Sequence, residues 1–377
     1  MTERWKGPAP GASMHRMSAL SLDALDTPAA IVDLDRVERN LQRVAAYARE
    51  HGLRLRPHTK THKTVELGAL QVAAGASGVT VATVLEAEVM ARVSDDVLLA
   101  YPTVGARRLA RLMALPSRVR LTVALDSREA LEGLAQAARD AGRTVDVLVE
   151  LDLGMRRVGL RTPEDAVALA RVAASTTGVA FRGVTFYAGH IRIPQAELPA
   201  AMQAQSQTLA SFVDALRAAG LPPEVVSGGS TPTLWQSHLV RGLTEIRPGL
   251  NVLNDRNSVT IGASDWSECA YSVLATVVST AVPGQVVIDA GAKALAKEEG
   301  LAPGYGVLLD RPEVVVKNLS EEHGLIDVSA TTWRPRIGER VRVVPNHVCV
   351  SVPLHARLHV VRGDTGVATW EVAARGW

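Results

Sequence analysis

Short runs rich in β-branched residues alternate with longer amphipathic stretches between about residue 53 and residue 250. In the stretches 129–141 (EALEGLAQAARDA) and 164–174 (EDAVALARVAA), apolar residues recur at three- and four-residue spacing, as in helices packed on a sheet. The runs that predict strands are 53–56, 78–82, 96–100, 118–125, 145–151, 181–186, 224–227 and 243–246. Eight strands alternating with helices favour a closed parallel (β/α)8 barrel.

An open, doubly wound α/β sheet fits the same alternation of strands and helices. However, no Gly-x-Gly-x-x-Gly sequence follows an early strand, so the pattern for dinucleotide binding is missing. We therefore expect the barrel.

The pattern changes beyond about Val259. Strand-like runs with turn residues between them predict a separate β domain; they occupy residues 271–278, 285–288, 340–344 and 358–361. The early run 30–34 precedes the first helix and is a candidate strand of the same domain. We expect residues 1–34 to join the β domain, 35–256 to form the barrel and 257–377 to form the β domain.

Composition narrows the functional class. Hydrophobic residues make up 47% of the 377 residues, charged residues 21%, and the net charge is +2, as in soluble globular proteins. Without a Lys/Arg-rich block we expect no nucleic acid or membrane partner. The first 22 residues lack the apolar core of a secretory signal, and two cysteines suit a reducing compartment. The sequence therefore predicts a cytoplasmic protein.

Lys60 is the first candidate for chemistry. It lies in the segment 57–63 (PHTKTHK), directly after the first predicted barrel strand. Active sites of (β/α)8 barrels lie at the carboxyl ends of the strands. A lysine amine held there among other cations can form an imine with a carbonyl compound. The alternative is a solvated lysine in an ordinary surface loop.

A glycine-rich segment forms the second candidate site. Residues 227–231 (SGGST) follow the seventh predicted strand, and Arg247-Pro248-Gly249 follows the eighth. Loops after strands seven and eight are the usual phosphate site of this architecture. Glycines let backbone N–H groups approach a phosphate, and hydroxyl groups add further donors. The alternative is a simple tight turn.

His347 and Cys349 form the third candidate site. In a strand, residues two apart project from the same face, so both side chains can bind one ion. Imidazole and thiolate suit Zn²⁺, while Mn²⁺ remains open if oxygen ligands dominate. Two protein ligands leave room for water or a substrate oxygen. The alternative is a buried structural cysteine beside an unrelated histidine.

The lysine segment resembles the cofactor-lysine motif of the D-threonine aldolase/D-serine dehydratase family, whose barrel is similar to that of alanine racemase. The resemblance extends from Thr27 to near the C-terminus. Its further motifs are ELDLGMRRVGL (150–160), YAGH (187–190), SGGSTPT (227–233), TEIRPG (244–249), DAGAK (289–293), EHG (322–324) and PNHVC (345–349). It implies fold type III, with pyridoxal phosphate (PLP) in the barrel mouth, a β domain and a homodimer.

The resemblance also implies residue roles. Lys60 corresponds to the Schiff-base lysine and to the base at the substrate Cα. Arg157 contacts the phenolic oxygen of PLP or the nearby ring edge, and Tyr187 lines the cofactor face. The residues that cradle the phosphate are Ser227, Gly228, Gly229, Ser230, Thr231 and Gly249. Arg247 matches the alanine racemase arginine that faces the pyridine nitrogen; alternatively, it pairs with Glu245 or another carboxylate.

The implied activity is a lyase reaction on D-3-hydroxy-α-amino acids. His-x-Cys resembles the dehydratase side of the family, since the aldolases generally have His-x-Asp. The aldolases carry a histidine directly after the tyrosine matched by Tyr187, whereas here Ala188 follows and the candidate base His190 comes two positions later. We therefore favour dehydration over retro-aldol cleavage. An amino-acid racemase and a non-catalytic PLP-binding protein are the alternatives.

Overall fold

The computed structural model describes residues 22–377; residues 1–21, which include nearly all of the segment judged not to be a secretory signal, lie outside the described residues. The chain divides into two compact units, which we call the barrel unit and the β unit. The barrel unit comprises Arg43–Lys60, Leu67–Gly249 and Gly376–Trp377. The β unit comprises residues 22–42, Thr61–Glu66 and Leu250–Arg375.

The barrel unit contains an eight-stranded parallel sheet in the order β2-β9-β8-β7-β6-β5-β4-β3. Its strands are β2 (Arg54–Leu55), β3 (Val79–Val81), β4 (Asp96–Leu99), β5 (Arg120–Leu125), β6 (Val145–Leu151), β7 (Val179–Phe186), β8 (Val225–Gly228) and β9 (Glu245–Ile246). The sheet curls so that the end of β2 meets β3 through the bridge His58–Thr80 and the bond from Thr80 N–H to Pro57 O. The predicted fold, a (β/α)8 barrel with a β domain, is confirmed.

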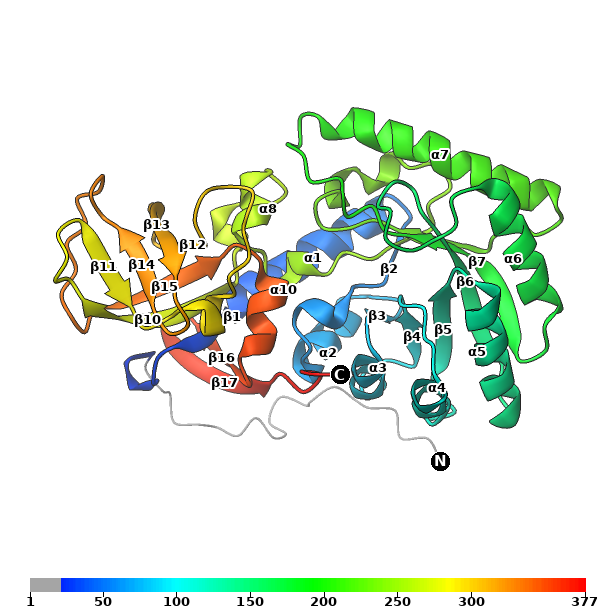
Figure 1. Cartoon of the computed structure of the whole chain (residues 1–377), viewed down its shortest axis with the longest axis horizontal. Helices are drawn as coiled ribbons and strands as arrows, with labels where there is room; N and C mark the ends of the chain where they lie inside the picture. Colours follow the sequence, from blue (N-terminus) through cyan, green and yellow to red (C-terminus); the bar gives the residue numbers. More distant parts are fainter. Residues whose placement is uncertain (1–21) are drawn as a thin grey trace. The chain divides into compact units, whose positions relative to one another are not determined.

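Helices precede or connect these strands and cover the outer face of the sheet (Figure 1). They are α1 (Leu34–Glu50), α2 (Val65–Ala73), α3 (Val84–Met90), α4 (Ala106–Met113), α5 (Arg128–Asp140), α6 (Pro163–Ser175) and α7 (Leu198–Ala218). Helix α5 begins where the Ser127 hydroxyl accepts the Ala130 N–H, and it buries Leu131, Leu134 and Ala138. Helix α6 combines a Thr162 cap with Pro163 in its first turn.

Strand β6 shows why the barrel places polar side chains inside. All seven of its residues are buried, as expected for a parallel strand covered on both faces. Val147, Val149 and Leu151 belong to the apolar core shared with the helices. Glu150 alternates with these residues and therefore faces the barrel interior. The interior face is thus the one that carries candidate chemistry.

The β unit contains a nine-stranded sheet in the order β11-β14-β13-β12-β15-β10-β1-β16-β17. Its strands are β1 (Ala29–Asp33), β10 (Tyr271–Ser279), β11 (Gln285–Ile288), β12 (Gly306–Leu308), β13 (Arg311–Leu319), β14 (Gly324–Asp327), β15 (Arg340–Pro345), β16 (Arg357–Arg362) and β17 (Thr365–Glu371). The early strand β1 pairs with β10 and β16. The β unit also contains three short helices, α8 (Arg256–Thr260), α9 (Ala292–Leu295) and α10 (Val348–Ser351).

No helix within residues 22–377 is long and apolar enough to cross a membrane.

Candidate active site

Lys60, Arg157 and Tyr187 meet in the barrel unit although they are far apart in the sequence. Lys60 lies in the short 3-10 helix η2 (Thr59–Thr61), which follows β2. Its Nζ is 5.4 Å from the centre of the Tyr187 ring, and the guanidinium carbon of Arg157 is 5.1 Å from the same centre. Both cations are within the range of cation–π attraction. The structure therefore brings together an amine, a guanidinium and an aromatic face.

The position of Tyr187 depends on the turn that follows it. Tyr187 comes directly after β7, and the chain then folds back over its ring at Gly189. A Cβ atom on Gly189 would lie 2.2 Å from Tyr187 Cε1. Only glycine leaves the ring in this position, which explains the residue type in the YAGH motif.

The glycine-rich segment forms a buried turn after β8. Gly229 has a φ of +81°, a conformation that side-chain-bearing residues rarely adopt. The Thr233 hydroxyl accepts the Ser230 N–H at 3.2 Å and also lies 3.2 Å from Ser230 Oγ. Thr231 and Gly249 are buried as well. This compact turn at the carboxyl end of a barrel strand has the chemistry of an anion site.

The Ser227 hydroxyl and Arg247 point into the barrel interior. Arg247 donates one bond to Ser227 Oγ at 2.7 Å and another to the Phe186 carbonyl at 2.8 Å. Ser227 Oγ in turn donates to Glu245 Oε1 at 2.7 Å. Because the hydroxyl is engaged in this way, a contact from Ser227 to a phosphate falls to its backbone.

Arg247 does not form the expected alternative ion pair with Glu245. Glu245 instead accepts a bond from Arg56 Nε at 2.9 Å, and Arg56 also pairs with Asp96 at 2.6 Å. Burial lowers the pKa of Arg247, while the nearby carboxylates of Glu150 and Glu245 oppose that shift. Arg247 is therefore a buried cation held mainly by neutral acceptors.

Glu150 is a buried carboxyl group of this region that sequence reasoning did not single out. Burial raises its pKa to about 7, although the charges of Arg247 and Arg157 act in the opposite direction. Its Oε2 atom and the Thr185 Oγ1 atom are buried without a hydrogen-bond partner among the described residues. Its place in the ELDLGMRRVGL motif, seven residues before Arg157, was the available signal.

These residues fit PLP by their chemistry. The amine of Lys60 suits an aldehyde, the Gly229 turn suits a phosphate, and Arg157 suits an anionic ring oxygen. The unpartnered oxygens of Glu150 and Thr185 add polar groups that a bound molecule can engage. The polar groups of these residues are therefore chemically suited to bind PLP, the cofactor that the resemblance implies.

His347 and Cys349 lie in the β unit, but the prediction that they sit in a strand is wrong. Strand β15 ends at Pro345, and helix α10 begins at Val348. The buried carboxylate of Asp255 accepts the Val348 N–H at 3.0 Å, so it satisfies a backbone donor at the start of this helix. The two residues therefore flank the first residue of a helix and do not alternate along a strand.

Charged and polar groups surround the His347 side chain. Burial acts to lower the pKa of His347, but the interactions with Cys349, Asp255 and Glu298 outweigh it and raise the pKa to about 10. A divalent ion takes the place of the protons on the imidazole and the thiol when both groups act as ligands. Imidazole and thiolate together suit Zn²⁺. Across residues 22–377, no cluster of three or more His, Cys, Asp or Glu residues is arranged to hold a metal ion.

The other candidate histidines have separate environments. His190 is exposed, and its ring packs beside Gly154 in the barrel unit. In the β unit, His323 is exposed in the turn between β13 and β14, whereas His355 Nε2 donates to the Ala294 carbonyl at 3.0 Å. The His355 ring is therefore held by a hydrogen bond to the backbone, whereas the His190 ring is exposed to solvent.

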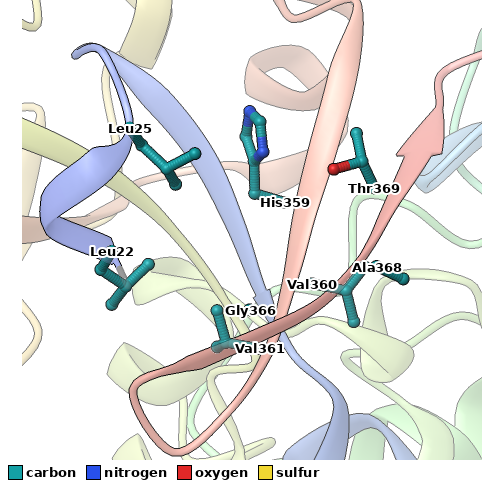
Figure 2. Close-up of a pocket in the computed structure, with 8 residues that line it drawn as sticks. All are labelled: Leu22, Leu25, His359, Val360, Val361, Gly366, Ala368 and Thr369. Carbon is teal, nitrogen blue, oxygen red and sulfur yellow. The ribbon is translucent and has the colours of Figure 1, made fainter. Parts of the chain in front are cut away.

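A small hollow in the β unit is lined by none of the candidate site residues (Figure 2). It is lined by Leu22, Leu25, His359 and Thr369, among others, and has a cavity volume of about 20 Å³. That volume accommodates about one water molecule. The hollow is too small for an amino-acid substrate.

Two family models match the chain. Alanine racemase, N-terminal domain, matches residues 32–256, and the putative serine dehydratase domain matches residues 270–361. The chain is 35% identical over 382 residues to D-threo-3-hydroxyaspartate dehydratase of Delftia sp. (strain HT23), covering 95% of this chain and 99% of that protein. It is 33% identical over 365 residues to a D-threonine aldolase of Arthrobacter sp, covering 94% of each.

Solved structures of these enzymes also resemble this chain. The D-threonine aldolase from Filomicrobium marinum superposes with a TM-score of 0.88 at 34% identity, covering 95% of this chain and 98% of that one. The Delftia dehydratase superposes with a TM-score of 0.87 at 34% identity, covering 95% and 100%. A D-threo-3-hydroxyaspartate dehydratase has also been solved as a His→Ala variant and, with a cysteine two positions further on replaced, as a Cys→Ala variant in the metal-free form.

Proposed function

Because the chain belongs to the alanine racemase-like family that includes D-threonine aldolases and D-threo-3-hydroxyaspartate dehydratase, we propose that it is a lyase acting on D-3-hydroxy-α-amino acids with PLP and a divalent metal ion. The observation that carries the proposal is the meeting of Lys60, Arg157 and Tyr187 on the barrel. The His347-Cys349 pair supports the metal requirement.

The site residues of the barrel unit each have a role in the proposed reaction. When bound, the cofactor supplies an electron-accepting ring and the metal supplies Lewis acidity at a hydroxyl oxygen. Lys60 Nζ removes the proton from the substrate Cα and holds it. Tyr187 keeps that amine in place through its ring face. Arg157 binds an anionic oxygen, and the Gly229 turn binds the phosphate.

Of the two lyase reactions we propose dehydration. His347-x-Cys349 has the same residue types and spacing as the histidine and cysteine replaced in the solved variants of D-threo-3-hydroxyaspartate dehydratase. In this reaction the Cα–H and Cβ–O bonds break, water leaves, and the remaining enamine hydrolyses to a 2-oxo acid and ammonia. Lys60 takes the Cα proton, and a metal ion held by His347 and Cys349 would supply Lewis acidity to the leaving hydroxyl oxygen.

Retro-aldol cleavage is the second candidate, because a D-threonine aldolase covers the chain equally well. It requires a base that removes the β-hydroxyl proton, after which the Cα–Cβ bond breaks to give glycine and an aldehyde. The exposed His190 is the candidate base on the barrel unit. His190→Ala should therefore abolish cleavage and leave dehydration nearly unchanged.

The test is product analysis with purified protein, PLP and Zn²⁺. D-3-hydroxyaspartate or D-threonine should give a 2-oxo acid and ammonia, whereas glycine and an aldehyde would identify the aldolase reaction. The L-isomers serve as controls and should give neither product. Interconversion of D- and L-alanine that persists with a chelator would instead support the racemase. Absence of every one of these reactions would overturn the proposed function.

We propose Zn²⁺ as the metal because imidazole and thiolate are its preferred donors. We also propose a homodimer in the cytoplasm, on the family resemblance and the sequence alone. Metal analysis of the purified protein and sedimentation equilibrium test these two points separately.

A further inference from the structure

The Glu298 carboxylate contacts the imidazole ring of His347 in the β unit. The His347 Nδ1 atom lies 2.9 Å from Glu298 Oε1 and 3.0 Å from Glu298 Oε2, so both carboxylate oxygens face one ring nitrogen. The side chains are 21% and 37% exposed, which leaves the contact partly screened from water. With Nδ1 engaged, Nε2 is the nitrogen available to an ion.

Asn346 fixes the backbone around this contact. Its amide nitrogen donates to the Glu298 carbonyl at 3.1 Å and to the Gly304 carbonyl at 2.8 Å, and its oxygen accepts from Arg256 at 3.1 Å. Asn346 directly precedes His347 and is buried. The segment that carries Glu298 is therefore attached to the residue next to His347, and the carboxylate is held independently of its own ion pair.

We propose that Glu298 is a positioning residue for the metal ion, a role that deepens the proposed function and rests on His347 and Cys349 being ligands. A carboxylate that accepts the Nδ1 proton fixes the tautomer, aims Nε2 at the ion and makes the imidazole a stronger donor. With only two protein ligands, the site depends on how well each ligand is oriented. Loss of such a partner typically costs about 10–100-fold in metal affinity.

A purely structural ion pair is the competing explanation. That explanation predicts that removing Glu298 lowers the melting temperature and leaves the affinity for the metal unchanged. The positioning role predicts the reverse: a lower affinity with little change in the melting temperature of the metal-free protein. The two readings therefore differ in a measurement that does not involve catalysis.

The experiment measures Zn²⁺ affinity of the metal-stripped full-length protein by competition with a chromophoric chelator. Glu298→Gln keeps an acceptor oxygen but removes the charge, and Glu298→Ala removes both. We expect the dissociation constant to rise about tenfold in the first variant and further in the second. Glu299→Gln is the matched control, since it removes one exposed carboxylate from the adjacent position and should leave affinity unchanged. Cobalt-substituted protein should show the same order in its thiolate-to-cobalt absorption.

Two further variants separate the possible failures. If His347→Ala and Cys349→Ala bind Zn²⁺ as tightly as the wild type, the proposed metal site itself is wrong. If these variants lose affinity but Glu298→Gln and Glu298→Ala do not, the site stands and the positioning role of Glu298 is overturned. Should Glu298→Ala not fold, Glu298→Gln alone decides the question.

Discussion

Glu150 on β6 and Thr185 on β7 are direct register partners in the parallel sheet, and each has one buried oxygen without a hydrogen-bond partner in the described part of the chain. Partners in register project from the same face, so the carboxyl and the hydroxyl lie side by side inside the barrel. The same register continues from Thr185 to Ser227 on β8. A polar layer therefore crosses three neighbouring strands next to Arg247.

Glu150 should make stability depend on pH. Burial raises its pKa to about 7 from an ordinary value of 4.5, so the folded protein keeps a proton that the unfolded chain releases. This group leaves stability unaffected below pH 4.5, lowers it progressively as the pH rises from 4.5 to 7, and costs about 3 kcal/mol above pH 7. Glu150→Gln removes this destabilisation, so its melting temperature relative to wild type should rise by roughly 3–4 °C between pH 5 and pH 8.

Calorimetric melting temperatures at equal ionic strength test this expectation. Glu129→Gln removes an exposed carboxylate near the start of α5 and should follow the wild type at every pH. A Glu150→Gln curve parallel to that of the wild type would show that the carboxyl group is ionised in the folded protein throughout this range.

Gly189→Ala should weaken cofactor binding through Tyr187. The new Cβ atom would lie 2.2 Å from Tyr187 Cε1, so the ring must move away from Lys60 and Arg157. Overpacking of this kind costs about 1–3 kcal/mol, and we expect the dissociation constant of PLP to rise about tenfold. Absorption titration of the apoprotein measures it.

Gly133→Ala is the control for that substitution. Its Cβ atom in α5 would lie 3.6 Å from the Leu109 side chain of α4, an ordinary contact, and α5 should gain slightly in stability. Equal PLP affinity in Gly189→Ala and Gly133→Ala would mean that the Tyr187 ring does not contribute to binding.

The barrel could be predicted from the sequence because its signals are local. Each of the eight predicted strand runs overlaps an observed strand, and the run at 145–151 matches β6 at both ends. In the β unit, the strands β12, β13, β14 and β17 were not anticipated. Strands β13, β14 and β17 each pair antiparallel with the strand just before them in the chain. Strand propensity depends strongly on context, so such strands leave a weak mark in the sequence.

The site could be predicted only where a motif carried it. Lys60 was named from its place after the first predicted strand, Arg157 and Tyr187 were named from the resemblance, and the structure brings the three together. Glu298 lies 49 positions from His347, in a stretch with two adjacent glutamates and no motif. The helix start at Val348 was missed because its cap comes from Asp255, whose side chain is remote in sequence.

Lys60→Ala should abolish covalent attachment of PLP. No other amine is placed in this way against the Tyr187 ring among the described residues, so the near-visible absorption band of the wild type should be lost. Loss of the base at Cα should also lower turnover by more than about 100-fold. Borohydride reduction followed by peptide mass analysis locates the linkage; a labelled peptide that lacks Lys60 in the wild type would contradict the assignment.

Cys349 should react with iodoacetamide in the metal-stripped protein and be protected by Zn²⁺. It is partly accessible, whereas Cys269 is buried and burial raises the pKa of the Cys269 thiol to about 12. Alkylation should therefore stop at one equivalent, and saturating Zn²⁺ should slow it at least about tenfold.

The Thr61 hydroxyl lies 3.2 Å from Cys349 Sγ. Thr61→Val removes this bond, and protection should then require about tenfold more Zn²⁺; Thr61→Ser, which keeps the hydroxyl, should match the wild type. Modification of both cysteines, or a rate that Zn²⁺ does not change, would remove Cys349 from the metal site.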